Sequence, residues 1–136
     1  MLLEGRVHKD GKFWLSECDA LDAMTQGKSK QEAIAMLEDW IRTALDDSKF
    51  PVDIESVGGG LEIRVQPNVK FLALMLQRTR QKVGLTIRDA AKALGFKSHN
   101  AYAQYESGQR EPSISQLERF LAKLSSDGEE LMVKIS

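Results

Sequence analysis

The stretch GLTIRDAAKALGFKSHNAYAQYESGQREP, residues 84–112, decides the fold of the second half of this 136-residue chain. Four apolar residues in it recur with the i, i+3, i+4, i+7 spacing of one helix face: Ile87, Ala90, Ala91 and Leu94. Thr86 precedes them as a candidate N-cap, and Gly95 follows where a left-handed residue can end a helix. Ser98 can cap a second helix, with Tyr102 and Tyr105 in the core. The stretch therefore predicts two short helices joined by a tight turn.

Such a pair is a helix-turn-helix, whose second helix enters the major groove of DNA. The candidate base-reading residues lie along this second helix: Ser98, His99, Asn100, Ala103 and Gln104. The amides of Asn100 and Gln104 can form paired hydrogen bonds with adenine, and His99 can contact guanine or a phosphate. Helix capping is the alternative role for His99 and Asn100.

A second group of residues is placed to meet the phosphate backbone rather than the bases. It comprises Thr86, Arg88, Lys97 and Arg110. Phosphate contacts set affinity and salt dependence but carry no sequence information. For each of these residues, a solvated surface side chain is the alternative interpretation.

The same stretch resembles the Xre/Cro-type helix-turn-helix family over several separate motifs. They are Gly84-Leu85-Thr86, Ala91 to Gly95, Tyr105-Glu106-Ser107-Gly108, and Arg110-Glu111-Pro112-Ser113. This resemblance implies an all-helical DNA-binding domain, which we place at residues 68–124. Its first helix carries Phe71, Leu72, Met75, Leu76, Thr79 and Val83 inward, with Arg78, Arg80 and Lys82 expected to face solvent. Its last helix carries Ile114, Leu117, Phe120, Leu121 and Leu124.

Charge divides the chain at the same place. Residues 1–67 carry 8 Lys and Arg against 13 Asp and Glu, whereas residues 68–124 carry 10 against 4. A basic segment beside an acidic one favours two partners of opposite charge, although chance variation between segments is the alternative. Pro67 disfavours helix at Gln66, so the boundary is expected there.

The first half predicts a small antiparallel sheet with one helix. Residues 2–8 and 12–18 are expected to form a hairpin across Lys9-Asp10-Gly11, and residues 20–26 a third strand. Ser29 and Glu32 form a capping box ahead of an amphipathic helix that ends near Asp46-Asp47. After Pro51, Val52, Ile54 and Ser56 are expected to pair with Leu61, Ile63 and Val65 across three glycines. The order β-β-β-α-β-β gives an α+β fold whose sheet has one uncovered face.

Residues 1–66 resemble the N-terminal domain of HicB antitoxins. The matching features are Phe13-Trp14 in a hairpin, Cys18 to Leu21, Thr25-Gln26-Gly27, and the helix start Ser29 to Ala33. HicB proteins commonly carry a C-terminal DNA-binding domain, so the combined resemblance covers residues 1–124. Residues 20–24 read ALDAM, without the Pro or Gly usual at this place in the family.

The resemblance implies an antitoxin of a type II toxin–antitoxin system. Such a protein binds and occludes a small basic HicA-type ribonuclease toxin, which cleaves mRNA, and represses its own operon by binding double-stranded operator DNA. Because one helix-turn-helix reads a half-site, a homodimer or higher even oligomer is expected. The toxin contacts are unknown, and several acidic side chains are candidates: Glu17, Asp19, Asp22, Glu38, Asp39, Asp53 and Glu55. A transcription regulator with a small-ligand-sensing N-terminal domain is the alternative.

Other site chemistry is not indicated by the sequence. Gly27-Lys28-Ser29 lacks the upstream glycine of a phosphate-binding loop, because residue 22 is Asp. Glu17, Asp19 and Asp22 have no fourth ligand at useful spacing, so no metal, cofactor or enzyme activity is expected. The single Cys18 cannot form an intramolecular disulfide, and no apolar run is long enough for a signal peptide or membrane span, which favours a cytoplasmic protein. The tail, residues 125–136, is either a strand pairing across a dimer or a frayed end.

Overall fold

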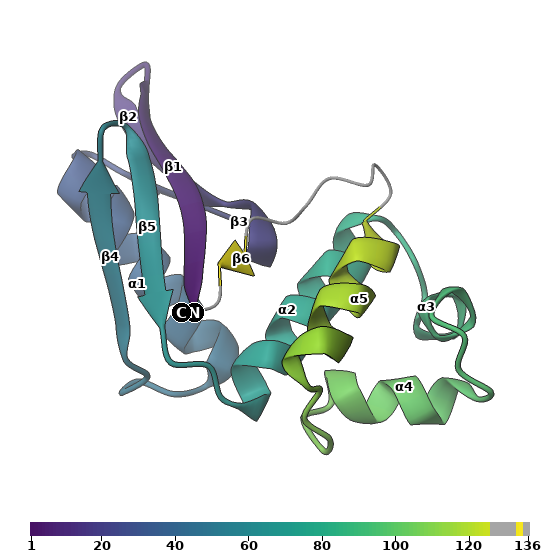
Figure 1. Ribbon diagram of the computed structural model, residues 1–136. Coiled ribbons are helices and arrows are strands. Elements are labelled where there is room, and N and C mark those ends of the chain that lie inside the picture. Colours follow the sequence, from purple (N-terminus) through teal and green to yellow (C-terminus); the bar gives the residue numbers. More distant parts are fainter. Residues whose placement is uncertain (126–132, 135–136) are drawn as a thin grey trace. The chain divides into compact units, whose positions relative to one another are not determined.

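The computed structural model of the protein describes residues 1–125 and 133–134. Two compact units divide between Gln66 and Pro67. We call residues 1–66, together with the strand at 133–134, the sheet unit, and residues 67–125 the helical unit. The fold class is α+β, with an antiparallel sheet first and a helix-turn-helix in the second unit (Figure 1).

Five strands of the sheet lie in the spatial order β3-β2-β1-β5-β4, and a short sixth strand pairs with β1 beside them. In chain order they are β1 (Leu2–Asp10), β2 (Phe13–Cys18), β3 (Ala23–Gly27), β4 (Val52–Val57) and β5 (Gly60–Val65). All neighbouring pairs are antiparallel. The order of strands and helix along the chain is the β-β-β-α-β-β order expected from the sequence.

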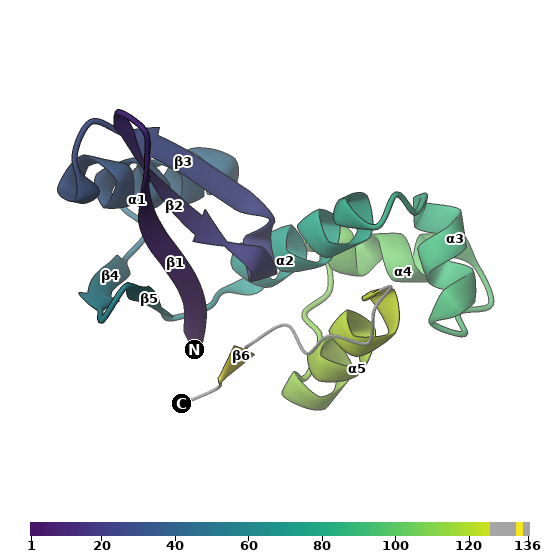
Figure 2. The same ribbon diagram turned by 90° about the horizontal axis from the view of Figure 1, so that it is seen from above.

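Helix α1 (Lys30–Leu45) covers one face of this sheet, as Figures 1 and 2 show from two directions. Its inner stripe is Ala33, Leu37, Ile41 and Leu45, all buried. The Oγ of Ser29 accepts a hydrogen bond from the Glu32 N–H, as expected of an N-cap. The Glu32 carboxylate accepts from the Lys28 N–H rather than from that of Ser29, so the capping box is shifted by one residue.

The second hairpin has the register that the sequence predicted, and the third strand does not begin where it was expected. Ile54 lies opposite Ile63, with the flanking pairs aligned around it. The third strand begins at Ala23, because one turn of 3-10 helix (Asp19–Leu21) and a left-handed Asp22 precede it. This turn buries Ala20 and Leu21, and aspartate tolerates the left-handed conformation better than most residues.

A short strand, β6 (Val133–Lys134), pairs antiparallel with the start of β1, where Val133 lies opposite Leu3. The expected tail, residues 125–136, otherwise lies outside the described residues, apart from Ser125. The described part of this tail therefore pairs within its own chain.

The helical unit consists of α2 (Val69–Lys82), α3 (Ile87–Ala93), α4 (His99–Glu106) and α5 (Ile114–Leu124). Each helix begins after a side-chain N-cap: Asn68, Thr86, Ser98 and Ser113, respectively. The inner residues of α5 are buried as expected, with one exception. Ile114 is 58% exposed because it occupies the first helical position, away from the buried stripe that begins at Leu117.

Candidate nucleic-acid interface

Helix α3, the first helix of the helix-turn-helix, has a local stop or start signal at each of its ends. Thr86 and Asp89 form a capping box, in which the Thr86 Oγ accepts from the Asp89 N–H at 3.0 Å and the Asp89 carboxylate accepts from the Thr86 N–H at 3.3 Å. Gly95 follows α3 with φ +81°, a backbone conformation that residues other than glycine rarely adopt. The expected helix-turn-helix geometry therefore follows from local sequence signals.

An aromatic cluster under α4 fixes this helix against the rest of the unit. Tyr102 and Tyr105 are buried, as expected, and each packs on Phe120 of α5, with ring centroids 6.4 and 5.3 Å apart. Phe96, in the turn, completes the cluster by contacting all three rings. With the tyrosines turned inward, the opposite face of α4 is left to solvent. Sequence reasoning missed the role of Phe96, because a turn residue has no helical periodicity.

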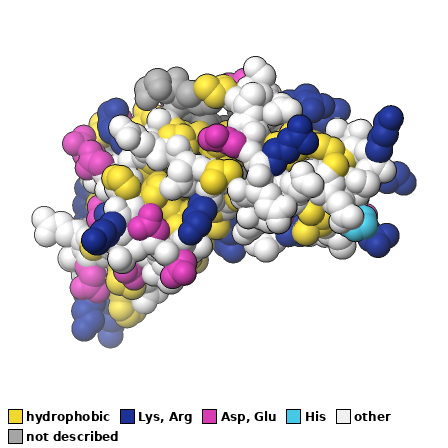
Figure 3. Space-filling model, turned by 90° about the horizontal axis from the view of Figure 1, so that it is seen from below, with side chains coloured by type: hydrophobic (Ala, Val, Ile, Leu, Met, Phe, Trp, Pro, Cys, Tyr) yellow, Lys and Arg dark blue, Asp and Glu magenta, His cyan; other side chains and the backbone are white. Residues whose placement is uncertain are grey.

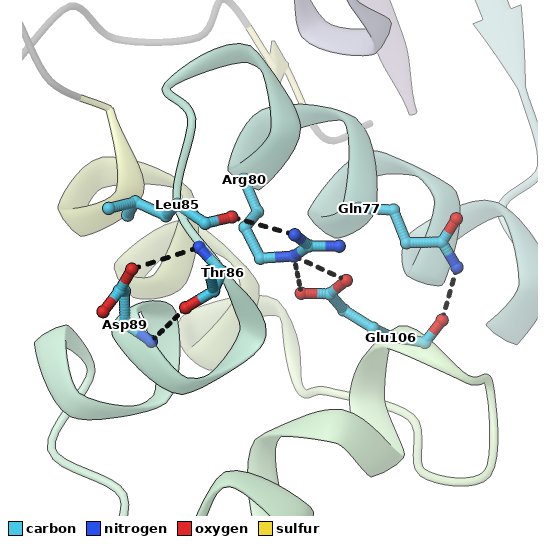
Figure 4. A network of polar contacts seen from close by, with 6 residues as sticks. All are labelled: Gln77, Arg80, Leu85, Thr86, Asp89 and Glu106. Carbon is cyan, nitrogen blue, oxygen red and sulfur yellow. Dashed lines mark hydrogen bonds and ion pairs between the residues drawn. The ribbon is translucent and has the colours of Figure 1, made fainter.

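A buried ion pair braces α2 against the end of α4 (Figure 4). The Nε of Arg80 lies 3.0 and 2.9 Å from the two carboxylate oxygens of Glu106, and the two side chains are only 14% and 4% exposed. Arg80 also donates to the Leu85 carbonyl at 2.9 Å, and Gln77 donates to the Glu106 carbonyl. The expectation that Arg80 faces solvent is wrong, because its guanidinium joins the segment before α3 to the end of α4.

The Glu106 carboxylate of this ion pair also lies near the buried phenol of Tyr102 on α4. Burial, with the neighbouring Glu106 carboxylate, raises the pKa of the Tyr102 phenol well above its usual range. Tyr102 is fully buried and uncharged at neutral pH, so it acts as a packing residue rather than as a reader.

The predicted base-reading residues all lie on α4 or at its cap. Ser98, Asn100 and Gln104 are exposed, whereas His99 and Ala103 are half-buried. Ser98 is the N-cap, and its Oγ accepts from the Ala101 N–H at 3.3 Å. Capping is thus performed by Ser98, which leaves the side chains of Asn100 and Gln104 directed to solvent.

The predicted phosphate-contacting residues lie on three segments around α4. Thr86, Arg88, Lys97 and Arg110 are all exposed. Thr86 stands at the start of α3, where its hydroxyl still has a proton to donate after it accepts from Asp89. The guanidinium of Arg110 stacks over the Tyr105 ring, 5.4 Å from its centroid, which holds this side chain beside the end of α4.

The charge of the helical unit suits a polyanion. Residues 68–124 carry six more Lys and Arg than Asp and Glu, and on the face drawn in Figure 3 the acidic side chains gather mainly over the sheet unit. Lys and Arg that reach a phosphate backbone release condensed counterions, which is the main source of affinity for DNA.

The comparison with protein families agrees with this geometry. Residues 76–131 match the family model described as helix-turn-helix. The chain therefore carries a helix-turn-helix unit of the Xre type. This is the domain type of DNA-binding transcription regulators, and the match covers less than half of the chain. No curated protein matches the sequence.

The acidic residues at the edge of the sheet unit are engaged with a cation of the chain itself. The two nitrogens Nη2 and Nη1 of Arg6 lie 3.0 Å from the Glu17 carboxylate and 2.8 Å from the Asp19 carboxylate. Within residues 1–125 and 133–134, no group of three His, Cys, Asp or Glu side chains could hold a metal ion. In the same part of the chain, no helix is long and apolar enough to cross a bilayer.

Proposed function

We propose that this protein is the antitoxin of a type II toxin–antitoxin system and acts in the cytoplasm without catalytic activity of its own. The observation that carries the proposal is that one chain contains a basic helix-turn-helix unit and an acidic α+β unit with the order of elements predicted from the sequence. The sequence resemblance of residues 1–66 to HicB antitoxins supports it. The helical unit recognises operator DNA, and the sheet unit binds a HicA-type ribonuclease toxin and covers its active site.

In the DNA-binding role, α4 enters the major groove of the operator. Asn100 and Gln104 read adenine edges, His99 contacts a base or phosphate, and Ser98 and Ala103 line the approach. The phosphate contacts come from Thr86, Arg88, Lys97 and Arg110. Because one unit reads a single half-site, the protein binds as a homodimer or higher even oligomer and represses its own operon.

The decisive experiment is co-purification of the full chain with the product of the adjacent short reading frame, together with growth rescue on co-expression. We expect a stable complex and restored growth. Gln104→Ala should then weaken specific operator binding by about 1–3 kcal/mol while growth rescue is unchanged. A Gln104→Ala protein that fails in both assays would identify Gln104 as a structural residue instead.

A second candidate function is a transcription regulator whose sheet unit senses a small ligand. It is favoured by a pocket of about 570 Å³ in the sheet unit, lined among others by Arg42, Lys49, Phe50 and Arg64. Asp53 also lines the pocket, and Arg64 is paired with Glu62. The remaining positive charge, from Lys49 and Arg42, would favour a small anionic ligand. This candidate predicts operator affinity that changes with a metabolite and no toxic neighbour, which the same co-expression experiment separates from the first.

A further inference from the structure

The face of the sheet turned away from α1, which we call the outer face, carries mainly acidic side chains. Cross-strand pairing places six carboxylates on it: Glu4, Asp10, Glu17, Asp53, Glu55 and Glu62. Two cations share the face, Arg6 and Arg64. Within the described part of the sheet unit, α1 packs on the opposite face, so no helix of this unit covers the outer face (Figures 1 and 2).

Three of these carboxylates form a row across adjacent strands. Glu4 of β1 lies directly opposite Glu62 of β5, and Glu62 lies directly opposite Glu55 of β4. Like charges directly opposite each other destabilise a sheet. The row therefore carries repulsion wherever no cation of the chain offsets it, and a cationic partner would relieve this repulsion.

The cations of the outer face are already committed to ion pairs. Arg64 bonds to Glu62 at 2.8 Å, and Arg6 is shared between Glu17 and Asp19. Glu55, which is exposed, makes no ion pair with any residue that the structure describes. The row thus keeps excess negative charge at its β4 end.

Large apolar side chains flank the acidic row at both edges of the sheet. Met24 of β3, 61% exposed, lies opposite Glu17, and Val57 of β4, 52% exposed, lies opposite Gly60. Both point to the outer face, because Glu17 and Gly60 each pair with Arg6. Exposed apolar side chains next to polar ones on the same face mark many protein interaction sites, so Met24 and Val57 add apolar contact area beside the acidic row.

We infer that the outer face is the docking surface for a basic protein. The expected occupant is the ribonuclease toxin, so this inference rests on the proposed function. Neighbouring strands lie about 4.8 Å apart, so the row from Glu4 to Glu55 extends about 10 Å. That span is too wide for one ion and fits Lys and Arg side chains spaced along a protein surface. An RNA-binding protein presents such a surface, and carboxylates placed on it exclude RNA by competing for the same cations.

The test compares two exposed carboxylates that receive the same change of charge. Glu55→Lys alters the outer face. Asp39→Lys alters another of the candidate toxin contacts, which lies on α1 at the opposite face of the sheet and which this inference excludes from the docking surface. We expect Glu55→Lys to weaken the affinity of the full chain for the purified toxin at least tenfold, and Asp39→Lys to change it less than threefold. Calorimetric titration measures both.

A third variant separates a docking role from a structural one. Glu55→Gln removes one repulsive charge, so the free protein should become more stable, with the thermal midpoint of the sheet unit raised by about 1–3 °C. The same variant should bind the toxin more weakly than the wild-type chain does. A residue with a purely structural role would not raise stability and lower affinity together.

The outcomes distinguish this inference from the proposed function. If the toxin binds the wild-type chain and both lysine variants equally, the antitoxin function stands and the docking surface is wrong. If the wild-type chain binds no toxin, the proposed function fails, and a nonalysine peptide then serves as the probe. Peptide binding lost in Glu55→Lys but kept in Asp39→Lys supports the outer face as a basic-protein surface. Equal binding by the two variants, or none by the wild-type chain, overturns it.

Discussion

The two units of the chain use charge in opposite ways. The sheet unit carries its acidic residues on an exposed face, where Glu4, Glu62 and Glu55 oppose one another. The helical unit instead buries a charged pair, Arg80 and Glu106, to hold its recognition helix. In the sheet unit charge is a feature of the surface that the fold tolerates, and in the helical unit it is part of the core. A mutation in one unit should therefore change the stability of that unit alone.

The largest expected effect comes from breaking the buried pair. Arg80→Ala leaves the Glu106 carboxylate buried without its partner and should destabilise the helical unit by about 3–5 kcal/mol. Amide hydrogen exchange resolves the two units, and fluorescence reports on the sheet unit alone, because the only two tryptophans are Trp14 and Trp40. Lys82→Ala, an exposed cation at the end of α2, is the control. If the folded-state tryptophan signal is lost when the helical unit unfolds, the two units are not independent.

A smaller effect is expected from adding a side chain at Gly5, where β1 and β2 of the sheet unit approach closely. A Cβ added at Gly5 would lie 2.3 Å from the backbone carbonyl oxygen of Glu17, which neither strand can avoid without moving. Gly5→Ala should therefore lower the stability of the sheet unit by about 1–3 kcal/mol, measured by tryptophan fluorescence in urea. Gly60→Ala, whose nearest contact would be 3.4 Å, is the matched control. If the two substitutions lower the stability equally, the loss arises from strand propensity rather than from the clash.

Features encoded by neighbouring residues could be predicted from the sequence. The caps at Ser29 and Thr86 were predicted, and so was the register of Ile54 with Ile63. All depend on spacing within a few residues or across one short turn. The readers Asn100 and Gln104 were placed on α4 for the same reason, and their contacts with DNA stay a prediction.

Features that join distant segments could not be predicted. Arg80 and Glu106 are 26 residues apart, and nothing in the local pattern of α2 distinguishes Arg80 from its exposed neighbour Lys82. The acidic row needs the pairing of β1 with β5, which brings Glu4 to Glu62 across 58 residues. Strand order is set by packing of the whole unit, so the sequence revealed the acidic composition but not its alignment.

Helix caps allow the same perturbation to be made in both units. Ser29→Ala and Thr86→Ala each remove one side-chain acceptor from a helix N-terminus, and each should cost about 1 kcal/mol. The first should lower the stability of the sheet unit only, and the second that of the helical unit only. Urea unfolding followed by hydrogen exchange measures both. A single transition shifted by either variant would show that the units unfold together.

The smallest expected effect tests how the sheet unit treats a buried ionisable group. Burial raises the pKa of the Cys18 thiol from 9.0 to about 11. The unfolded chain therefore loses this proton first, so the thiol contributes stability that is fully present below pH 9 and is lost as pH rises toward 11. Most of this loss should fall between pH 9 and pH 11, and between pH 7 and pH 9 it should stay under about 1 kcal/mol of the free energy of unfolding. In Cys18→Ala the free energy of unfolding should change less with pH than in the wild-type chain. If it changes equally in the two proteins, the thiol ionises as readily in the folded state as in the unfolded state. The helical unit of the same samples should show no difference in slope, which makes it the internal control.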